Sequence, residues 1–273
     1  MITQTRREDL DSPKFQGTKT SIDFDSATGT INLAGSGLFD TITDFDAVGS
    51  LDDFGGIASS GTYDFGGAAG STTLDLGGVF SLDLKRHFLT EGFYPSDLFD
   101  SRGLIDDITD FDGATATDVN AEMLVRVTQD NPGSGSPTYS DFQTFANGTY
   151  KGRGFQFRAK LTSNDTAQDI RVSQLGYTAS LQRRTEQGNL TASGAGAKAI
   201  TFTHPFFTGT SALLGANSNL PSIGINAQNM ASGDYFEVSS VSGTGFTVHF
   251  KNSSNASIDR NFTYQAVGFG KGG

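Results

Sequence analysis

The chain has 273 residues, a formal net charge of −11, 35 glycines and 23 phenylalanines, but no cysteine and no tryptophan. The lack of cysteine excludes disulfides and thiolate metal sites, and no apolar run approaches the roughly 18 residues of a membrane-spanning helix. Many glycines together with Phe, Val and Thr favour short strands joined by tight turns over helices.

Charge is distributed unevenly along the chain. Residues 1–120 hold 21 Asp and Glu against 7 Lys and Arg, whereas residues 121–273 hold 9 against 12. An acidic first half repels nucleic acid, so we expect no nucleic-acid partner. Acidic side chains also keep a Gly-rich β protein soluble, and this alternative explains the same asymmetry.

Residues 1–20 offer few side chains to bury, so we expect an N-terminal arm that becomes ordered only against a partner. The first nine residues lack the apolar region of a secretory signal peptide. Residues 21–60 form an acidic, irregular segment. It is expected to begin with a β-hairpin over residues 21–33 that turns at 26–29.

A weak internal repeat follows. Residues 38–40 and 42–46 recur as residues 98–100 and 108–112. Two copies are too few for a solenoid, which needs three or more to bury a continuous core. We interpret them as equivalent edges or contacts in an assembly, with chance recurrence in an Asp- and Phe-rich chain as the alternative.

Strand signals are dense over residues 61–185. The clearest alternation, over 153–161, puts four apolar side chains on one face: Phe155, Phe157, Ala159 and Leu161. At least seven strands with regularly spaced turns indicate a jelly-roll-like β-sandwich. A single helical turn is expected near residues 84–89.

Small residues predict a linker at 186–198, followed by a second, smaller β-sandwich at 199–273. In that module Phe246, Val248 and Phe250 alternate with polar residues, as a half-buried strand requires. The predicted fold is therefore all-β, with an N-terminal arm, a central jelly-roll-like sandwich and a small C-terminal sandwich.

No pattern of catalytic residues stands out. His87, His204 and His249 lack metal-ligand spacing, no nucleophile elbow is present, and residues 106–113 lack the ligand pattern of an EF-hand loop. A looser calcium site between loops stays open, as does a glycan hydrolase with two facing carboxylates. We predict no enzyme activity, no catalytic residue, no cofactor and no metal.

Residues 142–181 contain the motifs Arg153-Gly-Phe-Gln-Phe-Arg-Ala-Lys-Leu161, Asp169-Ile-Arg-Val172 and Leu175-Gly-Tyr177. With these motifs the segment resembles the carboxy-terminal region of tailed-bacteriophage host-specificity (tail tip attachment) proteins.

The terminal module contains the motifs Ile200-Thr-Phe-Thr-His-Pro-Phe-Phe207, Gly245-Phe-Thr-Val-His-Phe250 and Phe262-Thr-Tyr-Gln-Ala-Val-Gly268. With these motifs it resembles H-type lectin-like domains and the receptor-binding tips of phage tail fibres. H-type lectins are usually trimers of six-stranded sandwiches with sugar sites near subunit contacts. This sequence carries Tyr264-Gln-Ala266 where the lectins often place a Trp before the Ala, so the resemblance implies the fold more firmly than the lectin's sugar site.

The resemblance implies a phage virion component, a tail fibre or receptor-binding protein that recognises the host bacterial surface. Its ligand would be a cell-surface glycan or other receptor, bound by a homotrimer because several weak contacts then act together. The chain would lie in the phage tail, after a cytoplasmic stage before assembly. The arm at 1–20 would dock to other tail or baseplate proteins, without membrane insertion.

Candidate contact residues are polar side chains expected in loops of the last sandwich. They are Asn217, Asn219, Asn226, Asn229, Asp234, Asn252, Asn255 and Arg260. For each of them an ordinary turn role is the alternative. The alternative function for the whole chain is a structural virion protein, such as an adaptor, baseplate or head-decoration subunit, that binds no receptor.

Overall fold

The computed structural model describes residues 1–35, 57–66, 73–93, 116–165, 168–210, 215 and 217–272. Within these ranges every regular element is a β-strand, and no helix there could cross a membrane. The predicted all-β fold is confirmed. The weak repeat and the acidic stretch at 106–113 lie outside the described residues.

The strands follow one another in chain order, and their bounds are β1 (Ile2–Arg7), β2 (Thr18–Thr20), β3 (Ile22–Asp25), β4 (Thr30–Leu33), β5 (Ser60–Asp64), β6 (Thr73–Phe93), β7 (Val119–Thr128), β8 (Gln143–Thr144), β9 (Gly148–Ser163), β10 (Asp169–Leu181), β11 (Arg183–Ala192), β12 (Lys198–Thr201), β13 (Ser222–Gln228), β14 (Tyr235–Ser239), β15 (Gly245–Lys251), β16 (Asn261–Phe269) and β17 (Lys271–Gly272).

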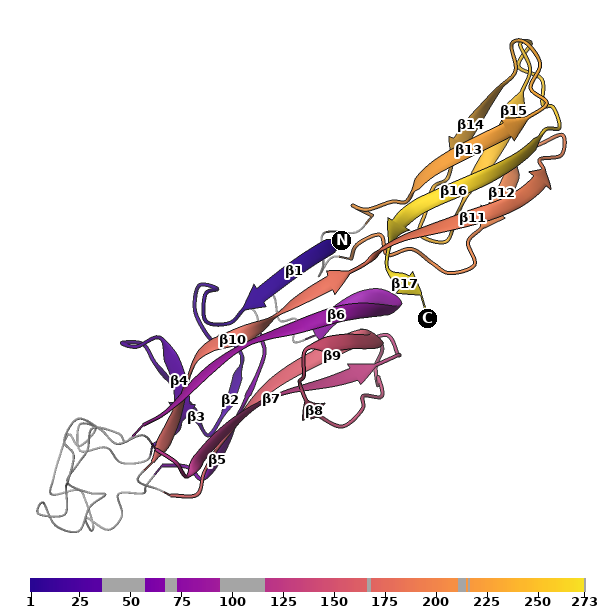
Figure 1. Ribbon diagram of the computed structural model, residues 1–273. Helices are drawn as coiled ribbons and strands as arrows, with labels where there is room; N and C mark the ends of the chain where they lie inside the picture. Colours follow the sequence, from indigo (N-terminus) through magenta and orange to yellow (C-terminus); the bar gives the residue numbers. More distant parts are fainter. Residues whose placement is uncertain are drawn as a thin grey trace, which may run out of the picture.

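Eleven strands of the described ranges form one antiparallel sheet that is nearly closed (Figure 1). Three long strands make its middle, because β6 pairs with β9 and with β10. β5 and β7 pair with β9, and β1 and β4 pair with β10. The inward face predicted for 153–161 is confirmed, since its four apolar side chains are all buried.

The hairpin expected over residues 21–33 is confirmed. β3 and β4 pair from Ile22 with Leu33 to Asp25 with Thr30. The Asp25 carboxylate closes the turn by accepting the backbone N–H of Ala27 at 2.8 Å. Such an Asx turn is the usual reason for Asp at the start of a tight turn.

The helical turn expected at 84–89 is wrong. These residues lie inside β6, which pairs with β10 from Asp83 through Phe93. The long-range backbone ladder decides the conformation here, as tertiary context commonly overrides local preference.

The expectation of an arm that is ordered only against a partner is also wrong. Ile2–Arg7 form β1, which pairs residue by residue with β10, and the Phe15 ring is buried in the core. The carboxylates of Glu8 and Asp9 are buried beside it and accept hydrogen bonds from the arginines of β1. Glu8 also accepts the hydroxyl of Tyr63. The chain itself therefore supplies the contacts that order this segment.

The stretch expected to link two bodies is part of the second one. Residues 183–192 form β11, which pairs with β16, and the small residues 193–197 turn between β11 and β12. Only Gln182 separates β10 from β11. The large sheet thus continues almost directly into the C-terminal sandwich.

Two crossings of the chain join the C-terminal sandwich to the large sheet. β10 of the large sheet continues through Gln182 into β11 of the sandwich. After β16 of the sandwich, β17 pairs with β6 of the large sheet. Between them Phe207, 1% exposed, enters the core of the large sheet and packs edge-on against Phe80 at 5.7 Å. Gly270 lies against these two rings with φ +86°, where a Cβ would come within 2.8 Å of Phe80. A larger residue does not fit at this position.

Arg184 adds polar contacts to the same junction. Its guanidinium lies 3.8 Å from the centroid of the Phe206 ring and donates to the carbonyl oxygens of His204 and Gly270. Because one side chain satisfies two carbonyls and covers an aromatic ring, it fixes the base of the sandwich.

A buried carboxylate marks the start of β10. Asp169 is 2% exposed and accepts the backbone N–H groups of Ile170 and Leu33 at 2.6 and 3.1 Å. Among the described residues it forms no ion pair. Burial raises its pKa from 3.8 to about 6, although these hydrogen bonds act in the opposite direction.

Replacing Phe207 by Ala should uncouple the two parts of the molecule. Deleting a buried Phe side chain costs about 3–5 kcal/mol of unfolding free energy, and here the loss falls on the junction. Calorimetry should show the sandwich and the large sheet unfolding in separate steps. Phe236→Ala is the control, because Phe236 is 39% exposed and lies away from the junction. A single, unshifted transition in the Phe207 variant would contradict this account of the junction.

Asp169→Asn should remove one pH dependence of stability. Because the folded pKa lies above the unfolded one, wild-type protein loses up to about 3 kcal/mol as pH rises from about 4 to about 6. The variant lacks this titration, so its stability relative to wild type should rise across that range. Urea unfolding at several pH values measures the difference, and a difference that stays flat contradicts the assignment.

Candidate functional site

The C-terminal sandwich consists of two three-stranded sheets, β11-β16-β13 and β12-β15-β14. The predicted small sandwich is therefore confirmed. Between the sheets lies an apolar core formed by Phe202, Phe206, Phe246, Val248, Phe250, Phe262 and Ala266. The face predicted for Phe246, Val248 and Phe250 is the buried one.

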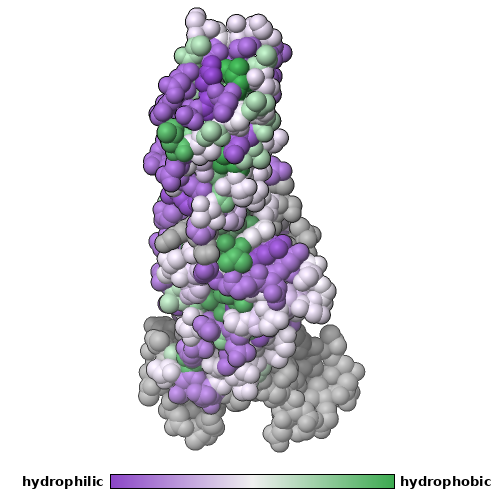
Figure 2. Space-filling model, turned by 90° about the vertical axis from the view of Figure 1, so that its right-hand side faces the viewer, coloured by the Kyte–Doolittle hydropathy of each residue, from purple (hydrophilic) through white to green (hydrophobic). Residues whose placement is uncertain are grey.

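The sandwich has a base and a tip. At the base lie residues 202–221 and 240–244, next to the large sheet. At the tip lie the loops 193–197, 229–234 and 252–260, at the far end of the elongated molecule (Figure 1). On the face that lies to the right in Figure 1, hydrophobic residues form small patches separated by hydrophilic surface (Figure 2).

The structure brings five of the eight candidate residues together at the tip. These are Asn229, Asp234, Asn252, Asn255 and Arg260. Asn226 lies on the outward face of β13. Asn217 and Asn219 lie in the turn before β13, at the base, and so are separate from the others.

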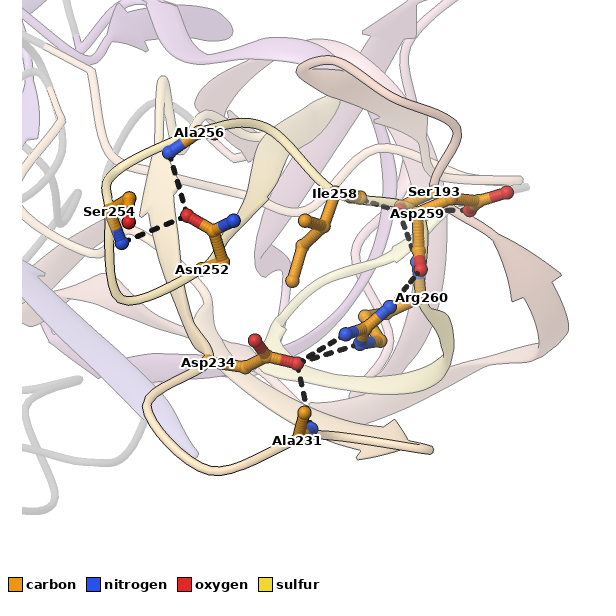
Figure 3. Close-up of polar contacts among 9 residues, drawn as sticks. All are labelled: Ser193, Ala231, Asp234, Asn252, Ser254, Ala256, Ile258, Asp259 and Arg260. Carbon is orange, nitrogen blue, oxygen red and sulfur yellow. Dashed lines mark hydrogen bonds and ion pairs between the residues drawn. The ribbon is translucent and has the colours of Figure 1, made fainter.

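Arg260 and Asp234 tie two tip loops together (Figure 3). The Asp234 Oδ2 atom accepts a hydrogen bond from Arg260 Nε at 2.9 Å and another from the backbone N–H of Ala231 at 2.7 Å. The pKa of Asp234 is held below its usual range, chiefly by the Ala231 N–H and then by Arg260. This pair joins the 229–234 loop to the end of the 252–260 loop.

The third tip loop is joined through Ser193 and Asp259. The Ser193 hydroxyl accepts a hydrogen bond from the backbone N–H of Arg260 (Figure 3). The Asp259 carboxylate accepts one from the backbone N–H of Gly194 at 2.7 Å. All three loops at the tip are thus connected by hydrogen bonds.

The asparagines of the tip shape their own turns. Asn252 Oδ1 accepts the backbone N–H groups of Ser254 and Ala256 at 3.0 and 2.9 Å (Figure 3). Asn229 and Asn255 have φ of +57° and +62°, in the left-handed region that Asn tolerates well. The side chain of Asn255 also accepts the hydroxyl of Tyr235. These contacts support the turn role for the tip asparagines.

A second polar surface lies on the outward face of the β11-β16-β13 sheet. Of its polar residues, only Asn226 is among the predicted contact residues. There Gln187, Asn189, Thr263 and Gln265 join Asn226 around a shallow depression of about 570 Å³. The alternation within β11, β13 and β16 could have placed these residues on one face. Which strands are neighbours, however, is set by pairing over long sequence distances.

The three histidines lie apart. His87 lies in β6 beside Thr178, and burial lowers its pKa. His249 lies on the outward face of β15 and contacts Ser257, while His204 is at the base. Within the described ranges no three His, Asp or Glu side chains form a group that could hold a metal ion.

No family model, curated protein or solved structure matches the chain.

Asp234→Ala should loosen the tip without unfolding the sandwich. The change removes the acceptor of both Ala231 N–H and the Arg260 guanidinium, so amide hydrogen exchange should become faster across 229–234 and 252–260. Exchange in β15 and β16 should stay slow. Asn226→Ala, whose side chain makes no hydrogen bond to a described residue, is the matched control. Equal exchange in the two variants would show that the ion pair does not order the tip.

Proposed function

We propose that the protein is a phage tail component, a tail fibre or receptor-binding protein that recognises the host bacterial surface through its C-terminal sandwich. The observation that carries this proposal is the position of that sandwich at one end of an elongated molecule (Figure 1). The resemblance of residues 142–181 to tail tip attachment proteins, and of the terminal module to fibre tips, supports the same function.

The junction supports this function physically. Two chain crossings, the buried Phe207 ring and the Arg184 contacts hold the sandwich firmly on the large sheet. A module held in one orientation loses less conformational freedom when it binds a surface than a freely tethered one. The large sheet then acts as a rigid support.

Self-association is part of the proposal, with a homotrimer as the assembly. β14 is an edge strand whose five residues are all exposed. Phe236 and Val238 share a side of the sheet with the buried Phe250 and Val248, yet are 39% and 36% exposed. An uncovered apolar edge of this kind favours contact with a second copy. Several copies would add their weak surface contacts together.

The surface that docks to other tail or baseplate proteins differs from the N-terminal arm that the sequence predicts. Because residues 2–7 are built into the large sheet, they are not a free arm. We place this docking on the surface of the large sheet, which leaves the sandwich available to the host.

Cryo-electron microscopy of the virion tests this function. The map should place the chain in the tail, with the large sheet against other subunits and the tip loops 193–197, 229–234 and 252–260 facing outward. A map in which the sandwich is covered by other virion proteins would refute receptor binding and favour a structural subunit.

A further inference from the structure

The outward face of the β11-β16-β13 sheet is hollowed by two backbone features. The first is a β-bulge in β11, where the ladder pairs Gly188 with Tyr264 and then Thr191 with Phe262. Asn189 and Leu190 therefore both lie opposite Thr263, and both are exposed. A bulge redirects side chains in this way and is common beside functional sites.

The second feature is Gly224, which forms part of the depression on β13. It pairs with Gln265, and a Cβ added to it would meet only the Gln265 carbonyl oxygen, at 3.8 Å. Within the described part of the chain, therefore, no neighbouring atom requires glycine for space at this position. A glycine inside a strand leaves room for close approach of another molecule.

Unused hydrogen-bonding groups surround this hollow. The side-chain amides of Gln187, Asn189, Asn226 and Gln265 line it, and none of them bonds to another residue in the part of the chain that the structure describes. The tip differs, because Asn252 and Asn255 there are hydrogen-bonded to their own loops. Four amides offer both donors and acceptors to a ligand.

The lining also defines the chemistry of that ligand. None of the described residues that line the depression is charged, and Leu190, 53% exposed, adds an apolar surface to the lining. A sugar ring combines vicinal hydroxyls, which donate and accept, with an apolar C–H face. A volume of about 570 Å³ is in the size range of small-molecule sites. A charged ligand would find no counter-charge here.

We propose that this amide-lined face binds a neutral saccharide segment of the host surface. The inference rests on the proposed function and adds to it a location, apart from the tip loops, and a ligand class. A second copy of the chain is the competing occupant. The lining argues against it, because the cores of subunit interfaces are rich in aromatic and apolar side chains and this face is mainly amide.

Binding of the full chain to immobilised oligosaccharides tests the proposal. The probes are neutral oligosaccharides of hexoses, N-acetylhexosamines and deoxyhexoses, with a matched set that carries uronic or sialic acids. Wild-type protein should bind members of the neutral set in preference to the acidic set. Preference for the acidic set, or no binding by protein that still adheres to host cells, would overturn the saccharide assignment and leave the proposed function intact. Absence of both activities would count against both.

Two variants locate the site. Gly224→Val fills the hollow where space is open, and Gln265→Ala removes an amide, so each should weaken binding by about tenfold. Gln228→Ala, on the same outward face of β13 but outside the lining, should change binding by less than about twofold. Thermal unfolding confirms that each variant is folded.

Unchanged binding in both site variants would place the saccharide elsewhere and overturn the proposal. A lower molecular mass of either variant in light scattering would overturn it as well, because the face would then be a subunit contact.

Discussion

The junction between the large sheet and the C-terminal sandwich sets the position of every surface that the sandwich presents. Phe207 belongs to the sandwich in sequence but to the core of the large sheet in space. The return of β17 to β6 closes the connection a second time. Because the Phe207 ring is buried and β17 is hydrogen-bonded to β6, the sandwich is fixed to the large sheet and is not joined by a flexible linker. This connection holds in one orientation the binding surface that we propose for the sandwich.

Contacts within the chain also order the N-terminal segment. β1 is short and polar, and its pairing with β10 would be weak without the carboxylates of Glu8 and Asp9 behind it. These carboxylates are buried beside the arginines of β1, so the ion pairs are partly shielded from water and from salt. Breaking either pair would leave a buried charge uncompensated, which costs more than an exposed pair contributes. Order at the start of the chain is thus a property of the fold.

Sequence alternation predicts the strands that are half-buried, such as 153–161 and 245–251, because each carries its own period of two. It cannot predict β1, whose order depends on a partner strand more than 160 residues away. Nor could it predict the bulge in β11, which follows from the register of β16. For the candidate site, polarity predicts Asn226 as a loop residue, whereas the structure places it on the outward face of β13, where long-range pairing sets its neighbours on β11 and β16. The polarity of the loop asparagines predicts a contact role, and in the structure that polarity serves to form turns.

Hydroxyl-radical footprinting of the full chain, with and without host cell-surface polysaccharide, shows whether the sandwich face binds the host surface. Leu190 and Leu89 are a matched pair of reporters, since they are 53% and 52% exposed and lie on the sandwich and on the large sheet. If the sandwich face binds the host surface, polysaccharide should protect Leu190 from oxidation and leave Leu89 unchanged. Protection of Leu89 alone, or of neither residue by a polysaccharide that binds, would contradict the account.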